Sequence, residues 1–255
     1  MRAYEIQGAG GIDALAISER FEPDPGPGQV KVKIHASSIN YRDLLMIEDP
    51  LSRGLELPRI PNSDGAGEIV AIGSGVNRVK VGDRVVGCFF QNWKSGVITA
   101  DGMAAALGGA LDGVLSEYVL LEEAGVVQVP DHLSFGEAAT LPCAALTAWH
   151  ALVERGRIKA GDTVLLLGTG GVSIFGLQFC ALHGVRTIIT SSSDEKLERA
   201  KTLGAWATIN YLKSPDWQKE VQILTDGSGV DHVLEVGGAG TLERSIESTR
   251  IGGNI

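Results

Sequence analysis

A glycine-rich turn after a short apolar run is the clearest chemical feature of this sequence. The apolar run covers residues 164–167, and a segment with apolar residues at helical spacing follows the turn. The turn and the start of that segment comprise Gly168, Gly170, Gly171 and Val172. Strand, glycine turn and helix in this order let backbone N–H groups approach a pyrophosphate at the positive end of the helix. The third glycine of the G-x-G-x-x-G pattern is replaced by Ser173, so the prediction of a dinucleotide pocket depends on the surrounding strands and helices.

The residues about 20 positions beyond the glycine turn indicate which nicotinamide cofactor the pocket would hold. An NAD pocket usually has an acidic residue there, which accepts hydrogen bonds from the ribose 2′-hydroxyl. This chain has Ser191 and Ser192 instead, and Lys196 follows one turn into the next segment, where it could pair with a 2′-phosphate. We therefore expect NADPH in preference to NADH. A solvated helix charge is the alternative role for Lys196, and the neighbouring Asp194 and Glu195 weaken the preference slightly.

The elements that must position these residues alternate between strand and helix in the second half of the chain. Apolar strands are expected at residues 185–190, 208–211 and 230–236, with Ser193 as the N-cap of the helix after the first of them. Regular alternation of this kind predicts an α/β fold with a doubly wound parallel sheet. Residues 252–255 begin a fifth strand, and we expect the chain to be truncated there with that strand barely started.

The first half of the chain has the pattern of β structure. Residues 30–36 alternate apolar and polar side chains, and glycine turns bracket further short strands at 65–73 and 81–87. We therefore predict a mostly β domain over residues 1–125 and a dinucleotide-binding domain over residues 126–255.

Composition and charge exclude several classes of partner. The formal net charge is −9, and Lys and Arg do not cluster, which argues against a nucleic-acid or anionic-membrane surface. No apolar run has the length of a signal peptide core or a membrane span. The three cysteines are far apart and form no C-x-x-C pair, as is typical of a reducing compartment. We expect a cytoplasmic protein with a small-molecule partner.

Five motifs in order resemble the medium-chain dehydrogenase/reductase superfamily, and within it the zinc-independent NADPH:quinone oxidoreductase-like branch. They lie at residues 38–43, 61–67, 81–85, 141–149 and 168–172. The resemblance implies an N-terminal GroES-like β domain, a Rossmann domain and a C-terminal segment that returns to the first domain. That last segment is missing here. Its absence puts in doubt both the closed cleft and the homodimer that this family usually forms across the sheet edge.

The positions that match the catalytic zinc ligands of related dehydrogenases separate two kinds of chemistry. Zinc-dependent members use two cysteines and a histidine. This chain has Asn40, Ser63 and Cys143 at the matching positions, and residues 91–113 contain no cysteine for a structural zinc. An amide and a hydroxyl are poor replacements for an imidazole and a thiolate, so we expect no zinc. The resemblance then implies hydride transfer from NADPH to a quinone or an α,β-unsaturated carbonyl.

The resemblance also assigns roles to individual residues around the nicotinamide. The ring would lie near Asn40, Thr147 and the turn at residues Val236 and Gly237. Asn40 could hydrogen-bond the cofactor or the carbonyl oxygen of the acceptor, and Tyr41 is a candidate proton donor, with simple packing as its alternative.

Tyr211 matches a tyrosine that flanks the adenosine phosphate in NADPH-dependent relatives, with packing at a strand end as the alternative. Arg42 and Asp43 are expected to fix local structure as an ion pair, and Cys143 to act as a small buried apolar residue. Two other functions stay open: an NADP(H)-binding module without turnover, and an alcohol dehydrogenase-like activity.

Overall fold

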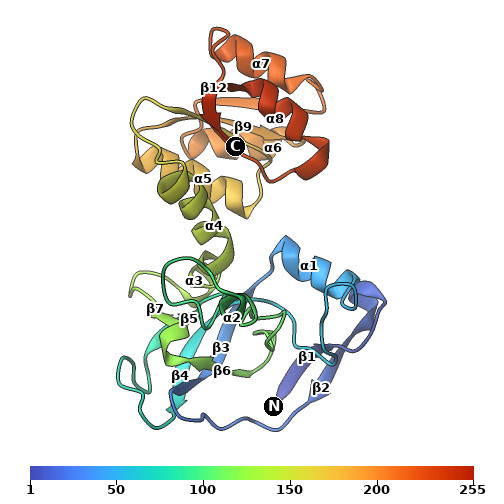
Figure 1. Ribbon diagram of the computed structural model, residues 1–255, viewed down its shortest axis with the longest axis vertical. Helices are drawn as coiled ribbons and strands as arrows, with labels where there is room; N and C mark the ends of the chain where they lie inside the picture. Colours follow the sequence, from blue (N-terminus) through green and yellow to red (C-terminus); the bar gives the residue numbers. More distant parts are fainter. The chain divides into compact units, whose positions relative to one another are not determined.

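The computed structural model describes residues 1–255, which form two compact units, Met1–Cys143 and Ala144–Ile255 (Figure 1). The division comes later in the chain than the boundary expected at residue 125. The intervening residues pack with the first unit because β7 (Val126–Gln128) pairs with β5 (Arg84–Gly87) in its sheet. Ala138 and Ala139 are then buried in a cluster of the same unit.

The first unit is built on an antiparallel five-stranded sheet with the order β6-β3-β4-β5-β7. Its remaining strands are β1 (Arg2–Ile6), β2 (Leu15–Glu19), β3 (Gln29–Ser38), β4 (Asp64–Ile72) and β6 (Tyr118–Glu122). Strands β1 and β2 form a separate hairpin. Val30 and Val32 of β3 and Ile69 of β4 are buried in the core of the sheet, as the alternating sequence pattern predicted.

Three α-helices belong to the first unit: α1 (Tyr41–Glu48), α2 (Ala100–Met103) and α3 (Phe135–Ala138). Helix α1 follows β3 directly and carries the residues that the sequence marked for catalysis. Its first turn is fixed by a reciprocal pair of hydrogen bonds. The Asn40 N–H donates to Asp43 Oδ2 at 2.8 Å, and the Asp43 N–H donates to the Asn40 carbonyl at 2.9 Å.

The second unit contains a parallel five-stranded sheet with the order β10-β9-β8-β11-β12. Its strands are β8 (Thr163–Leu166), β9 (Arg186–Ser191), β10 (Ala207–Asn210), β11 (Val230–Leu234) and β12 (Thr249–Asn254). The fifth strand is longer than the sequence pattern indicated. It begins at Thr249 beside Val230, and an ion pair of 2.7 Å between Arg250 and Asp231 holds it to β11.

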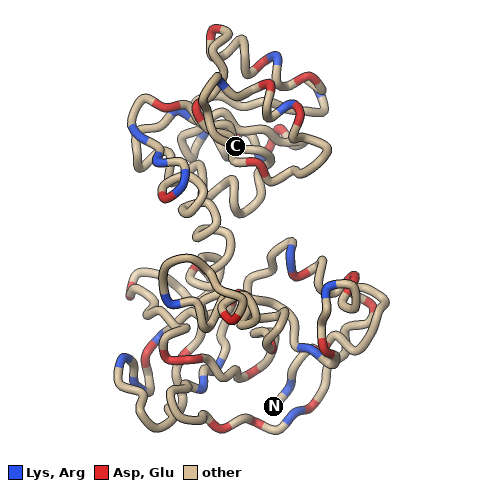
Figure 2. The backbone as a smooth tube through the Cα atoms, viewed as in Figure 1, with Lys and Arg blue, Asp and Glu red and all other residues tan.

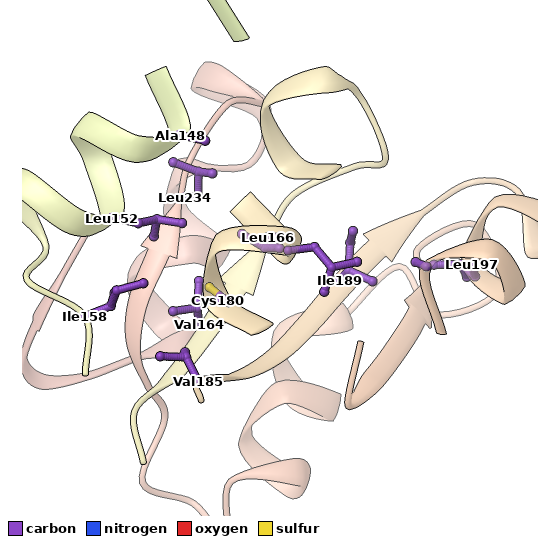
Figure 3. Packing of buried hydrophobic residues seen from close by; sticks show 12 residues of the cluster. Ala148, Leu152, Ile158, Val164, Leu166, Cys180, Val185, Ile189, Leu197 and Leu234 are labelled. Atoms are coloured by element: carbon purple, nitrogen blue, oxygen red, sulfur yellow. The ribbon is translucent and has the colours of Figure 1, made fainter. Parts of the chain in front are cut away.

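Helices pack against both faces of this sheet. They are α4 (Leu146–Trp149), α5 (Gly171–Leu182), α6 (Asp194–Thr202), α7 (Trp217–Leu224) and α8 (Leu242–Ser248). Val164 and Leu166 of β8 pack with Cys180 of α5 on one face (Figure 3), whereas Leu165 and Leu167 pack on the other face in the cluster that contains Trp217 of α7. This alternation makes the sheet doubly wound.

From β8, the next strands along the chain add on one side of the sheet, and the last two strands add on the other side. Strand β8 has β9 on one side and β11 on the other, so the connections from β8 and β11 diverge at their carboxyl ends. Ligands of open α/β sheets bind in the crevice outside such a switch point. The glycine turn follows β8 and the turn at Val236 follows β11, so both turns lie at this edge.

Charged residues of both signs are interspersed along the backbone of each unit (Figure 2). None of the helices combines the length and the apolar character needed to cross a lipid bilayer.

Candidate functional site

The glycine turn has open space where side chains would otherwise project. Gly168 has a φ of +71°, which favours glycine, and a Cβ atom at Gly168 or Gly170 would have no other atom within 4 Å. Gly170 is the N-cap of α5 and provides no side-chain acceptor for the first N–H groups of the helix. A cradle of unpaired N–H groups with no side chain above it fits a pyrophosphate.

Two hydroxyl groups of β9 anchor this turn from the neighbouring strand. Thr190 Oγ1 accepts a hydrogen bond from the Gly168 N–H at 3.0 Å, and the hydroxyls of Thr169 and Ser191 lie 2.9 Å apart. Ser173, which replaces the third glycine of the motif, is buried and donates from Oγ to the Leu167 carbonyl at 2.6 Å. The serine therefore stabilises the start of α5 where the motif has a glycine for close packing.

The residues predicted to select the cofactor meet at the carboxyl ends of β9 and β10. The Tyr211 N–H donates to the Ser191 carbonyl at 3.1 Å, so the tyrosine begins directly beside the serine. Ser191 itself is buried, and its hydroxyl is also the acceptor for the Ser193 N–H at 3.3 Å. Ser192 and Lys196 are exposed, and Tyr211 is 39% exposed, which leaves these three side chains accessible to a phosphate.

Asp194, an acidic residue in the first turn of α6, is already paired. Asp194 accepts hydrogen bonds from Lys213 Nζ at 2.6 Å and from Asn210 Nδ2 at 2.7 Å. The Lys213 ammonium, and after it the Asn210 amide, lowers the pKa of Asp194. Lys213, to which the sequence assigned no role, therefore offsets the charge of Asp194.

The turn after β11 brings Val236 and Gly237 to the same edge of the sheet. Val236 is 50% exposed. A Cβ atom at Gly237 would lie 2.3 Å from Thr241 Oγ1, so only glycine allows the turn to approach the start of α8 so closely. Thr147 is exposed on α4. This helix packs on α5 through an edge-to-face contact between Trp149 and Phe179, whose ring centroids lie 5.3 Å apart.

Asn40 and Tyr41 belong to the first unit, at the beginning of α1. Tyr41 is 76% exposed. Asn40 Nδ2 is shielded from solvent and lies near the Asp64 carboxylate without forming a well-aligned hydrogen bond. The expected ion pair is present: Arg42 Nη1 lies 3.3 Å from Asp43 Oδ1, and it also donates to the Leu107 carbonyl at 2.9 Å.

A buried carboxylate links the three positions that matched zinc ligands. Asp64 is fully buried and accepts hydrogen bonds from Ser63 Oγ at 2.6 Å and from the Cys143 N–H at 2.8 Å. Burial raises the pKa of Asp64, while Ser63, Cys143 and the nearby Asn40 amide act in the opposite direction. Burial also raises the pKa of Asp43. The cluster is therefore a polar network inside the first unit.

Sequence reasoning assigned no role to Asp64, although it lies in one of the five motifs. The available signal was a carboxylate at the start of a strand, followed directly by glycine and alanine residues. Such a residue is rarely buried unless hydrogen bonds hold it. The structure contains no group of three or more His, Cys, Asp and Glu side chains arranged to hold a metal ion.

Comparison with protein families gives matches in both units. Residues 26–131 match the alcohol dehydrogenase GroES-like domain, and residues 171–255 match a family described as zinc-binding dehydrogenase. A zinc-type alcohol dehydrogenase-like protein of Schizosaccharomyces pombe is 47% identical over 239 residues, which cover 92% of this chain and 69% of the relative.

Solved structures give the same relationship. An NAD-dependent alcohol dehydrogenase is 37% identical with a TM-score of 0.90, over 99% of this chain and 76% of that one. A quinone oxidoreductase of Escherichia coli, solved as a complex with NADPH, is 27% identical with a TM-score of 0.84, over 98% of this chain and 70% of the other.

Proposed function

Because this chain belongs to the medium-chain dehydrogenase/reductase superfamily of oxidoreductases, we propose that it transfers hydride from NADPH to a quinone or an α,β-unsaturated carbonyl. The observation that carries the proposal is the side-chain-free glycine turn at the switch point of the parallel sheet. The likeness to a quinone oxidoreductase that binds NADPH supports the same assignment.

In the proposed complex the second unit holds the cofactor from the carboxyl ends of β8, β9, β10 and β11 and from Thr147 of α4. Gly168, Gly170, Gly171 and Val172 surround the pyrophosphate; Ser191, Ser192, Lys196 and Tyr211 receive the 2′-phosphate end; and Thr147, Val236 and Gly237 face the nicotinamide end. The N–H groups at the start of α5 donate to the pyrophosphate oxygens, and the helix dipole favours their negative charge.

The first unit contributes the residues proposed for substrate chemistry. Asn40 Nδ2 has no well-aligned hydrogen bond although it lies near Asp64, and a carbonyl oxygen that gains negative charge would be a strong acceptor for it. Tyr41 is exposed and can donate its phenolic proton at the end of the reaction. NADPH, when bound, supplies the hydride, and the protein residues orient the reactants and hold these protons.

A metal-free reaction is part of the proposal and follows from the donor chemistry of Asn40, Ser63 and Cys143. Ser63 Oγ is already engaged as a donor to Asp64, and Asn40 can offer a zinc ion only a neutral amide oxygen, which is a weaker ligand than an imidazole or a thiolate. A quinone or an enone is already electrophilic, so it needs no Lewis acid of the kind that an alcohol oxygen requires.

The test is the oxidation of NADPH, followed by absorbance, with a benzoquinone and with an enone as acceptors, in the presence and absence of a chelator. We expect turnover with at least one acceptor, indifferent to the chelator. The alcohol dehydrogenase-like alternative is supported by the likeness to an NAD-dependent alcohol dehydrogenase. Oxidation of a primary alcohol by NAD⁺ that the chelator abolishes would establish that alternative, whereas NADPH binding without any turnover would indicate a binding module.

A further inference from the structure

Glu235, the residue that follows β11, accepts four hydrogen bonds from the turn and the helix that come after it. Its Oε1 accepts from the Gly237 N–H at 2.6 Å, the Gly238 N–H at 2.9 Å and Thr241 Oγ1 at 2.8 Å. Its Oε2 accepts from the hydroxyl of Ser245, which is fully buried in α8. One carboxylate therefore joins the end of the strand, the turn and the next helix.

No cation takes part in this arrangement. Burial raises the pKa of Glu235, but the hydroxyls of Ser245 and Thr241 and the N–H groups of Gly237 and Gly238 together lower it. The negative charge is thus held by backbone and hydroxyl dipoles, which form charge-assisted hydrogen bonds. A solvated glutamate would need none of these partners.

The turn is rich in glycine. It contains Gly237, Gly238 and Gly240, and glycine has the largest conformational freedom of any residue. Gly238 has a φ of +81°, and the Thr241 N–H donates to the Gly238 carbonyl at 3.0 Å. Glu235 therefore accepts from the N–H groups of both Gly237 and Gly238, while Thr241 and Arg244 donate to the carbonyls of Gly238 and Gly240.

The same turn lies at the switch point, beside the glycine turn that follows β8. Leu234 is paired with Leu166 in the register of the two strands, so Glu235 leaves the sheet at the level where the glycine turn begins. Ligand groups placed outside the carboxyl ends of β8 and β11 would face both turns.

We propose that Glu235 is a positioning residue that fixes residues 236–238 in the conformation that receives the nicotinamide half of NADPH. This inference rests on the proposed function, since it requires that NADPH bind across the two turns. Removal of the carboxylate leaves the glycine segment to be ordered by the ligand, and the cost of that ordering appears as weaker binding.

The test compares two ligands by calorimetric titration of the 255-residue protein. NADPH spans both turns, whereas adenosine 2′,5′-bisphosphate carries the adenosine end alone and lacks the nicotinamide. We expect Glu235→Ala to raise the Kd of NADPH by about tenfold and that of the bisphosphate by less than about twofold. Glu235→Gln retains an oxygen that accepts from both N–H groups, so the Kd of NADPH should stay within about threefold of the wild-type value.

Glu243→Ala is the matched control, because it removes an exposed carboxylate from α8, the helix that Glu235 contacts through Ser245. It should leave the Kd of both ligands unchanged. Thr241→Val removes a single hydroxyl donor at nearly constant volume and replaces Glu235→Ala in the test if that variant does not fold. It should raise the Kd of NADPH by about threefold and leave the Kd of the bisphosphate unchanged.

Equal NADPH affinity in Glu235→Ala and wild type would overturn the inference, as would equal losses of both ligands, which indicate a general structural role. Failure of the wild-type protein to bind either ligand would instead refute the proposed function, so the two failures are distinguishable.

Discussion

The Asp64 carboxylate is joined to the backbone of Cys143, whose N–H donates to its Oδ2 at 2.8 Å across 79 residues of sequence. This hydrogen bond ties the beginning of β4 to the last residue of the first unit. It also places a buried carboxyl at the centre of the residues that matched the metal ligands of related dehydrogenases. The protonation of Asp64 is therefore coupled to the stability of that unit.

The first prediction concerns Asp64→Asn and pH. Burial raises the pKa of Asp64 above its ordinary value of 3.8, so the folded state binds this proton more tightly than the unfolded state does. The stability due to that proton is complete below the ordinary pKa and is lost as the pH rises through the folded pKa. The free energy of unfolding of wild type minus that of Asp64→Asn should therefore fall as the pH rises.

Urea unfolding between about pH 4 and pH 7 measures this difference. Asp13→Asn changes an exposed carboxylate in the same unit and is the control, with a curve parallel to that of wild type. A difference between wild type and Asp64→Asn that stays constant or grows with pH would contradict the assignment.

The second prediction concerns cofactor preference. Lys213→Ala should raise the Kd of NADPH by about threefold relative to that of NADH, because Asp194 loses the cation that offsets its charge near the proposed 2′-phosphate position. Adding Asp194→Asn to the same protein should restore the ratio. Equal effects on both cofactors, measured by titration at low salt, would show that the Asp194–Lys213 pair has no part in the preference.

The third prediction concerns the close approach of β3 and β4. A Cβ atom at Gly67 would lie 2.0 Å from the Lys33 carbonyl oxygen, so Gly67→Ala forces the two backbones apart. We expect a loss of more than about 3 kcal/mol in the free energy of unfolding of the first unit. Hydrogen exchange of the β3 amides reports this loss.

Gly136→Ala in α3 is the matched control, since the nearest atom to its new Cβ would be Ser134 Oγ at 3.9 Å. That substitution should change the stability by less than about 1 kcal/mol. Similar protection of β3 in the two variants would contradict the steric argument.

The fourth prediction concerns the core shown in Figure 3. Leu166 is completely buried between β8 and the helices on one face of the sheet, so Leu166→Ala should destabilise the second unit by about 3 kcal/mol. Leu182, at the end of α5, is 80% exposed, and Leu182→Ala should cost less than about 0.5 kcal/mol. Urea unfolding of both variants measures the difference in stability, and equal unfolding midpoints would contradict the prediction.

The sequence predicted the elements whose patterns are local. The strands and turns around Val30 and Gly168 were expected from alternation and glycine spacing, and Ser193 is the expected N-cap of α6, with Oγ accepting from the Lys196 N–H at 3.3 Å. These features depend on residues within a few positions of one another, and so a single sequence contains the information.

Contacts between distant segments were not predictable in the same way. The pairing of Asp64 with Cys143 and of Asp194 with Lys213 depends on which strands become neighbours, and sequence spacing does not encode it. The length of β12 was underestimated for a related reason: its pairing with β11 is supported by the Arg250–Asp231 ion pair, whereas its glycines have weak strand propensity.

Strand β8 supplies the hydrophobic packing of both layers of the second unit from only a few consecutive residues. Its alternate side chains pack against helices on opposite faces of the sheet, and the glycine turn begins where the strand ends. Insertion or deletion of one residue would exchange the two sets of side chains and rotate the turn away from the crevice. The surface loops of this unit can therefore change in length, whereas the central strand must keep its number of residues so that each side chain stays on its own face of the sheet.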